Sequence, residues 1–121
     1  MIDTILDPKI WLILVAAAHS IMGIILPTDW SKSNNKAMGG YLLLTAFTML
    51  YAAFMMDGEE QARLAIVIAG PVWVWFIVSI MMELEIDMGE EPIVMTWKQN
   101  VPPLVLWGVL ALSGLLASGW I

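Results

Sequence analysis

Cysteine is absent from this 121-residue chain, and charge is scarce, since only 13% of the residues are Asp, Glu, Lys or Arg. The chain therefore has neither disulfides nor thiolate metal ligands. Five Lys and Arg stand against eleven Asp and Glu, giving a net charge of −6. This balance argues against nucleic acid as a partner, and against docking on an anionic lipid surface through a basic patch.

Catalytic signatures are missing as well. The sequence contains no phosphate-binding glycine loop, no HExxH motif and no CxxC motif. Histidine occurs once, at His19, and a single histidine cannot supply the several ligands of a zinc or di-iron site. The sequence thus gives no support for an enzyme activity of its own. Residues 1–9 are mostly acidic, unlike the start of a secretory signal, so we interpret the first apolar segment as a retained helix.

Apolar residues, in contrast, make up 60% of the chain, above the ~45–50% of ordinary soluble proteins. They are concentrated in four uncharged runs, at residues 10–26, 37–56, 64–82 and 101–121. As helices these runs would be about 25–32 Å long, which matches the ~30 Å hydrocarbon layer of a bilayer. They lack the alternation of barrel strands. We predict one all-α integral membrane domain over residues 1–121, with four transmembrane helices in an antiparallel bundle.

Tryptophans at the ends of the runs support this arrangement. Four spans place Trp11 and Trp120 at one interface and Trp30 and Trp97 at the other, as expected for an aromatic belt. Both termini and the DGEEQAR segment at 57–63, which we interpret as a tight turn, then share one side. The basic residues divide three against two between the sides, so they do not fix the orientation.

Each predicted helix carries one face of small, hydroxyl or aromatic residues, and small residues let helices approach closely in lipid. We expect these faces to point into the bundle, and Pro71 to kink the third helix. The four faces are Ala16, His19, Ser20 and Gly23; Tyr41, Thr45, Thr48 and Ala52; Ala65, Ala69, Val72, Phe76 and Ser79; and Trp107, Ala111, Gly114 and Ser118.

His19 is the main functional candidate because it lies near the middle of the first predicted span. An ionisable group at that depth is a candidate proton relay or ligand, and histidine is a usual axial ligand of haem iron. Its unperturbed pKa of about 6.5 suits a proton carrier. The plainer alternative is a neutral histidine bonded to a neighbouring hydroxyl or carbonyl.

Two further pairs accompany His19 at mid-depth. Thr45 and Thr48 supply hydroxyls, while Trp73 and Trp75 point to opposite sides of their helix, away from the belt positions. Such tryptophans are expected to contact protein, a pigment or cofactor, or a partner subunit. We therefore predict a cofactor site of His19, Thr45, Thr48, Trp73 and Trp75, with haem, a pigment or a quinone as the candidate classes.

The segment 83–100 is the longest predicted loop and the most acidic, with Glu83, Glu85, Asp87, Glu90 and Glu91. We interpret it as a solvated rim or a contact for a basic partner. Oxygen ligation of a hard cation is the alternative.

The layout of four spans in a short chain, with one titratable residue in the first, is similar to that of small multidrug transporters. That family carries a glutamate where His19 stands, and its loops are shorter than 83–100. The HSIMG stretch at 19–23 resembles the histidine–glycine helix of DoxX-like four-helix membrane proteins. Neither resemblance assigns a role to a residue of this chain.

Two functions follow as hypotheses. In the first, the chain is an accessory subunit that packs against other membrane subunits or copies of itself within the lipid bilayer. Its small-residue faces, mid-depth tryptophans and lack of catalytic motifs motivate this view. In the alternative, the chain is a small homo-oligomeric transporter or cofactor carrier that works through His19.

Overall fold

The structure, a computed structural model, describes residues 2–25, 30–86 and 92–121. One short helical turn, α1 (Ile2–Ile5), precedes four long helices: α2 (Pro8–Ile25), α3 (Ser33–Met55), α4 (Gly58–Met81) and α5 (Val101–Ala117). A small antiparallel pair, β1 (Glu85–Ile86) with β2 (Ile93–Val94), lies between α4 and α5. The four long helices confirm the helical part of the predicted class, whereas this strand pair was not predicted.

Three of the helices, α2, α3 and α4, are long and apolar enough to cross a membrane. The fourth, α5, is apolar but shorter, at 17 residues. It ends at Ala117 and not at 121 as predicted, because Ser118 and Gly119 leave the helix and Gly119 adopts a φ of +74°. Such a left-handed glycine is a common helix terminator.

Two helices begin earlier than the apolar runs suggested. α3 starts at Ser33, before the predicted 37, and α4 starts at Gly58, before the predicted 64. The DGEEQAR segment is therefore not a turn, because only Met56 and Asp57 separate the two helices. Glu59 and Glu60 occupy the first turn of α4, where acidic side chains are stabilised by the positive end of the helix dipole.

The first long helix begins at Pro8, two residues before the predicted 10, and is described to Ile25. A side-chain oxygen of Asp7 accepts a hydrogen bond of 3.0 Å from the backbone N–H of Lys9, which caps this end of the helix. Proline is well suited to the first helical position, since its missing N–H has no intrahelical partner there. The predicted last residue, at 26, lies outside the described residues.

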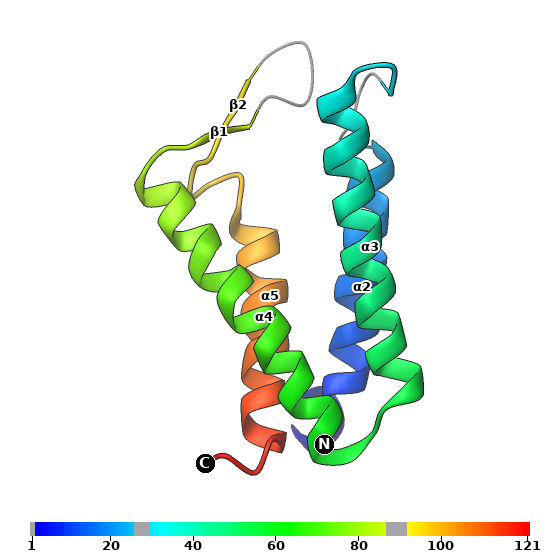
Figure 1. The fold of residues 1–121 in the computed structure, drawn as a ribbon. Helices are drawn as coiled ribbons and strands as arrows, with labels where there is room; N and C mark the ends of the chain where they lie inside the picture. The colour runs from blue at the N-terminus through cyan, green and yellow to red at the C-terminus, as the bar shows by residue number, and fades with distance from the viewer. Residues whose placement is uncertain (1, 26–29, 87–91) are drawn as a thin grey trace.

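Successive helices run antiparallel and form two pairs, α2 with α3 and α4 with α5 (Figure 1). The pairs are joined mainly through α2 and α5. The two chain ends and the 56–57 link lie at one end of the molecule, and the other connections lie at the opposite end (Figure 1). This is the order of helices that the tryptophans predicted.

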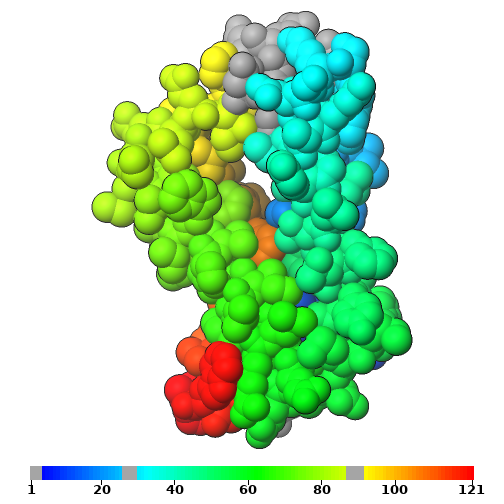
Figure 2. All heavy atoms as spheres, in the orientation of Figure 1, coloured from blue at the N-terminus to red at the C-terminus, as the bar shows by residue number. Residues whose placement is uncertain are grey.

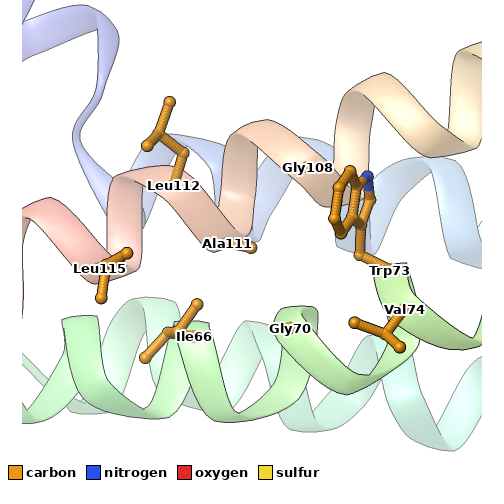
Figure 3. Close-up of a pocket in the computed structure, with 8 residues that line it drawn as sticks. All are labelled: Ile66, Gly70, Trp73, Val74, Gly108, Ala111, Leu112 and Leu115. Atoms are coloured by element: carbon orange, nitrogen blue, oxygen red, sulfur yellow. The ribbon is translucent and has the colours of Figure 1, made fainter.

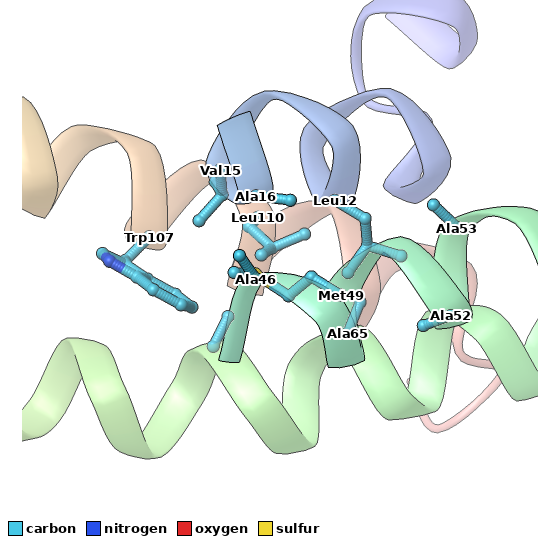
Figure 4. Packing of buried hydrophobic residues seen from close by; sticks show 11 residues of the cluster. Leu12, Val15, Ala16, Ala46, Met49, Ala52, Ala53, Ala65, Trp107 and Leu110 are labelled. Carbon is cyan, nitrogen blue, oxygen red and sulfur yellow. The ribbon is translucent and has the colours of Figure 1, made fainter. Parts of the chain in front are cut away.

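The hydrophobic core lies where the two pairs meet, and it is rich in alanine (Figure 4). Ala46, Ala52, Ala53, Ala65 and Ala69 are buried there. Their small side chains let the helices approach one another closely. Larger side chains fill the remaining space: Leu12, Val15, Met49, Trp107 and Leu110.

Most of the predicted inward faces are confirmed. Ala16 and Gly23 of α2 are buried, as are Ala65, Ala69 and Ser79 of α4 and Trp107, Gly114 and Ser118 of α5. The face predicted for α3 differs, because only its last member, Ala52, is buried, while Tyr41 and Thr48 are exposed. The α4 helix also runs through Pro71 without interruption.

Gly114 sets the closest approach between α4 and α5. A Cβ atom at this position would lie 2.7 Å from the backbone oxygen of Ala62 and 2.8 Å from the backbone nitrogen of Ile66. Both distances are shorter than real Cβ contacts, and both atoms belong to backbone. The α4–α5 pair in this geometry therefore requires glycine at 114.

Candidate functional site

The two helix pairs separate on the side of the core away from the chain ends, so α3 and α4 diverge as they leave their short link (Figure 1). Figure 2 shows the resulting opening in the molecular surface, with atoms of α5 visible through it. Because the walls come from both pairs, residues far apart in the sequence border one space.

His19 lies half-buried at the edge of the core. It follows the buried Val15 and Ala16 by four and three residues and so continues their face of α2. Its ring meets the Trp107 ring edge-on, with 5.1 Å between the centroids and 84° between the planes. Trp107 itself is only 2% exposed and lies at one end of the core cluster (Figure 4). The His19–Trp107 pair therefore links α2 to α5 at the edge of the core.

The ring nitrogens of His19 have no hydrogen-bond partner among the residues that the structure describes. In the same part of the chain, every side-chain nitrogen or oxygen that is sealed from solvent has a partner. The two facts together place the nitrogens of His19 in accessible space and not in a closed interior. The hydrogen bond that the plainer interpretation gave to His19 is thus not formed within the described chain.

Thr45 and Thr48 lie on the same face of α3 as Ala52, which follows them by seven and four residues. Thr45 is half-buried and Thr48 is exposed. Both hydroxyls donate to their own helix, Thr45 to the Tyr41 carbonyl at 2.8 Å and Thr48 to the Leu44 carbonyl at 3.0 Å. Their oxygens keep lone pairs that can accept.

The α4 wall is apolar and aromatic. Val72 and Phe76 pack against the core from this helix. Trp75 follows Ile68, which also packs against the core, by seven residues and so continues its face. The Trp75 side chain is 60% exposed.

Trp73 instead lies between α4 and α5. Its indole N–H donates to the Leu104 carbonyl of α5 at 3.1 Å, and its ring covers Gly108, where a Cβ atom would lie 2.9 Å from the indole nitrogen. Trp73 thereby closes one end of an apolar groove of about 290 Å³ between α4 and α5 (Figure 3). The groove is lined by Ile66, Gly70, Trp73, Val74, Gly108, Ala111, Leu112 and Leu115.

Of the five predicted site residues, His19 contacts Trp107 and Trp73 lines the groove between α4 and α5. Thr45 and Thr48 bond carbonyls of their own helix, and Trp75 is 60% exposed. The shared cofactor site therefore stays a prediction. Trp107, which the sequence analysis treated as a packing residue, is the direct neighbour of His19. The sequence did hold a clue to this contact. Trp107 lies six residues after the first residue of α5, which gives it a depth in the bundle similar to that of His19.

Metal ligation by protein alone finds no support in the described residues, because no group of three or more His, Asp or Glu side chains gathers there. Three members of the acidic segment, Asp87, Glu90 and Glu91, lie outside the described residues. Glu83 and Glu85 are described and exposed.

Comparisons with known protein families, with curated proteins and with solved structures gave no match for this chain.

Proposed function

We propose that this chain is an integral membrane protein with four spans and that it serves as a small accessory subunit of a larger membrane complex. The observation that carries the proposal is the low burial of its apolar helices. Only 28%, 28% and 22% of the most apolar windows of α2, α3 and α4 are buried within the fold. Exposing apolar surface to water costs about 25 cal/mol per Å², whereas lipid or a partner helix removes that cost.

The shortest of the four long helices, α5, is compatible with a fourth span. Its 17 residues extend over about 25 Å at 1.5 Å per residue, slightly less than the ~30 Å of an average hydrocarbon layer. Bilayers adapt to a short span by local thinning, and aromatic residues anchor its ends. Trp97 before α5 and Trp120 after it are both exposed and suit the two interfaces.

Large aromatic side chains far from the helix ends favour a complex over a solitary bundle. Phe47 of α3 is 70% exposed and Trp75 of α4 is 60% exposed, although both lie well inside their helices. Tryptophan in lipid prefers the interfaces, so a Trp75 at mid-depth is better satisfied by protein or a bound molecule.

Isolation of the tagged chain from its own membranes in mild detergent tests this proposal. We expect fixed amounts of other membrane proteins to co-purify, in a particle whose mass is not a multiple of 13.4 kDa. The double change Phe47→Ala and Trp75→Ala should weaken that particle, while Ile121→Ala, at a 79% exposed terminal residue, serves as the control. A particle made only of copies of this chain would contradict the accessory role.

A second function is favoured by one specific observation, the imidazole of His19, whose nitrogens have no hydrogen-bond partner among the described residues. In this proposal the chain is a small homo-oligomeric carrier of a cofactor or transported molecule. The test compares the visible absorption spectrum and transport activity of the purified protein with those of His19→Ala. Unchanged spectrum and unchanged transport would remove the support for this role.

A further inference from the structure

We infer that the apolar groove between α4 and α5 binds an acyl chain of a phospholipid whose headgroup carries a primary ammonium, as in phosphatidylethanolamine. In this arrangement Arg63 holds the lipid phosphate and Glu59 holds the ammonium. The inference goes beyond both proposed functions by naming a lipid site. It rests on the proposed membrane location, but neither on partner subunits nor on His19.

The groove is bounded at both ends by side chains that join α4 to α5. At one end, the indole N–H of Trp73 donates to the Leu104 carbonyl at 3.1 Å. Beyond the other end, Nε of Arg63 donates to the Ser118 carbonyl at 2.9 Å. Arg63 precedes the groove residue Ile66 by three positions and so lies on the same face of α4. The guanidinium therefore stands at the mouth of the groove.

The length of the groove matches one leaflet of a bilayer. Trp73 follows Arg63 by ten positions, which corresponds to about 15 Å along the helix, half of the ~30 Å hydrocarbon layer. The Arg63 guanidinium also lies over the Trp120 ring at 5.8 Å, and tryptophan prefers the headgroup region. An acyl chain that enters beside Arg63 thus ends near Trp73, close to the middle of the bilayer.

The walls of the groove suit a hydrocarbon chain. Its lining residues are apolar, and the indole N–H of Trp73, the one polar side-chain group among them, is already bonded to Leu104. Gly70 leaves the α4 wall open, because a Cβ atom there would meet only the Ile66 side chain, at 3.6 Å (Figure 3). A polar occupant would lack partners in this space, which is costly in hydrocarbon.

The mouth of the groove carries both signs of charge. Nη2 of Arg63 donates to Glu59 at 3.0 Å, and the two side chains are 39% and 62% exposed. The Nη1 amino group has no partner among the described residues and can donate to a phosphate, which guanidinium groups bind well. Glu59 extends over the end of α5, since a Cβ atom at Gly119 would lie 2.8 Å from its Oε1. Both charges therefore lie where a headgroup would sit.

This pair of charges fits a zwitterionic headgroup better than an anionic one. A primary ammonium donates hydrogen bonds to a carboxylate, whereas the trimethylammonium of a choline headgroup has no N–H to donate. An anionic headgroup would place a further negative charge beside Glu59, Glu60 and Asp57, which are all exposed, and like charges repel. The expected order of affinity is ethanolamine, then choline, then glycerol headgroups.

Native mass spectrometry of the delipidated chain in detergent, titrated with phospholipids that have identical acyl chains, tests the inference. We expect the ethanolamine lipid to bind more tightly than the choline and glycerol lipids. Glu59→Gln should weaken binding of the ethanolamine lipid about two- to fivefold, as for an exposed charged pair, and remove its preference over choline. Glu85→Gln changes an exposed carboxylate beyond the far end of α4 and should leave the preference intact.

Filling the groove provides a second test that leaves the charges in place. Gly70→Leu should weaken binding of all three lipids about fivefold or more, the effect of displacing one or two buried methylenes. Gly40→Leu is the matched control, since a Cβ atom at this position of α3 meets nothing within 4 Å. Equal lipid binding by these two variants, or a wild type without preference for ethanolamine, would overturn the inference.

The same spectra report on a different occupant. A lipid-free dimer that Gly70→Leu separates would assign the groove to a second copy of the chain and overturn the inference. Failure of lipid selectivity is distinct from failure of the membrane location, because labelling from the two sides of a vesicle tests the location. The composition of the native particle tests the accessory role.

Discussion

Gln61 illustrates how one side chain can hold two helices together. It is 6% exposed. Its side-chain amide nitrogen, Nε2, donates to the carbonyl oxygens of Ala52, Ala53 and Met56 at 3.0, 3.0 and 2.9 Å. These carbonyls are at the end of α3, where the helix itself supplies no donors. Gln61 therefore caps α3 from the first turns of α4.

We expect Gln61→Leu to lower the free energy of unfolding by about 1–3 kcal/mol, because buried carbonyls lose their donor. Gln61→Glu should cost at least as much, since a carboxylate would face the same carbonyl oxygens. Thermal unfolding in detergent, monitored by circular dichroism, measures both. Glu60→Gln, at the exposed neighbouring position, is the control and should change little. Equal stability of Gln61→Leu and Glu60→Gln would contradict the capping role.

Gly114 and Gly40 form a matched pair for testing the α4–α5 contact. Gly114→Ala pushes a Cβ into the backbone of α4, and we expect a loss of about 1–3 kcal/mol from overpacking. Gly40→Ala meets nothing within 4 Å and should be neutral or slightly stabilising, since alanine favours helix. The same unfolding assay compares them. A tolerated Gly114→Ala would mean that the two helices are further apart than described.

For single residues, the sequence predicts which face of a helix a residue lies on, but not which residue of another helix it contacts. The spacing of Ala16, His19 and Gly23 places them on one side of a helix, and the structure confirms that this side turns inward. Periodicity carries no information about the helix opposite, so the contact of His19 with Trp107 was not predictable. Gln61 was missed for a related reason, because a polar residue in DGEEQAR suggests a turn until its acceptors are known.

Among the elements, α5 is held at its C-terminal end by a side chain of another helix. The Arg63 side chain of α4 donates to the Ser118 carbonyl at 2.9 Å, bonds Glu59 at 3.0 Å and lies over the Trp120 ring at 5.8 Å. One arginine thus connects the last turns of α5 and the chain end to the start of α4.

We expect Arg63→Met to accelerate amide hydrogen exchange at the end of α5 severalfold, because the Ser118 carbonyl and the Trp120 ring lose their partner. Glu59→Gln should change exchange little, since an exposed ion pair contributes only about 0–1 kcal/mol. Hydrogen exchange with mass spectrometry resolves this segment. Equal exchange in Arg63→Met and wild type would show that α5 ends independently of Arg63.

The apolar runs predicted the four helices but not where they end. Loss of hydrophobicity marks the edge of a lipid-facing segment, whereas a helix continues until caps or backbone geometry stop it. Hence α3 and α4 include the polar Ser33 and Gly58 ends, and α5 stops before Gly119 although the apolar run continues. The β1–β2 pair is only two residues per strand, too short for a pattern of its own.

For the whole molecule, the absence of native cysteine permits a direct test of four spans. Single cysteines are introduced at the exposed positions Asn34, Asp57, Lys98 and Ile121 and labelled with an impermeant maleimide in sealed vesicles. We expect positions 34 and 98 to react from one side and positions 57 and 121 from the other. Since the parent chain has no thiol, it supplies the background.

The pattern of labelling separates the alternatives. If positions 98 and 121 react from the same side, then α5 does not cross and the bundle has three spans. If all four positions react from both sides of a uniformly oriented preparation, the chain is not embedded. The number and order of the long helices followed from the sequence, but the separation into two pairs did not. The small-residue faces predict that helices pack closely, but they do not predict where along the bundle the buried alanines lie.

The two-residue link between α3 and α4 has a consequence for biosynthesis. Each half of the chain supplies both members of a helix pair, so the first pair can close while the second is still being translated. The fold is then completed when two already formed helical hairpins associate. Halves divided between positions 56 and 57 and produced from separate messages should accordingly find each other and rebuild the molecule.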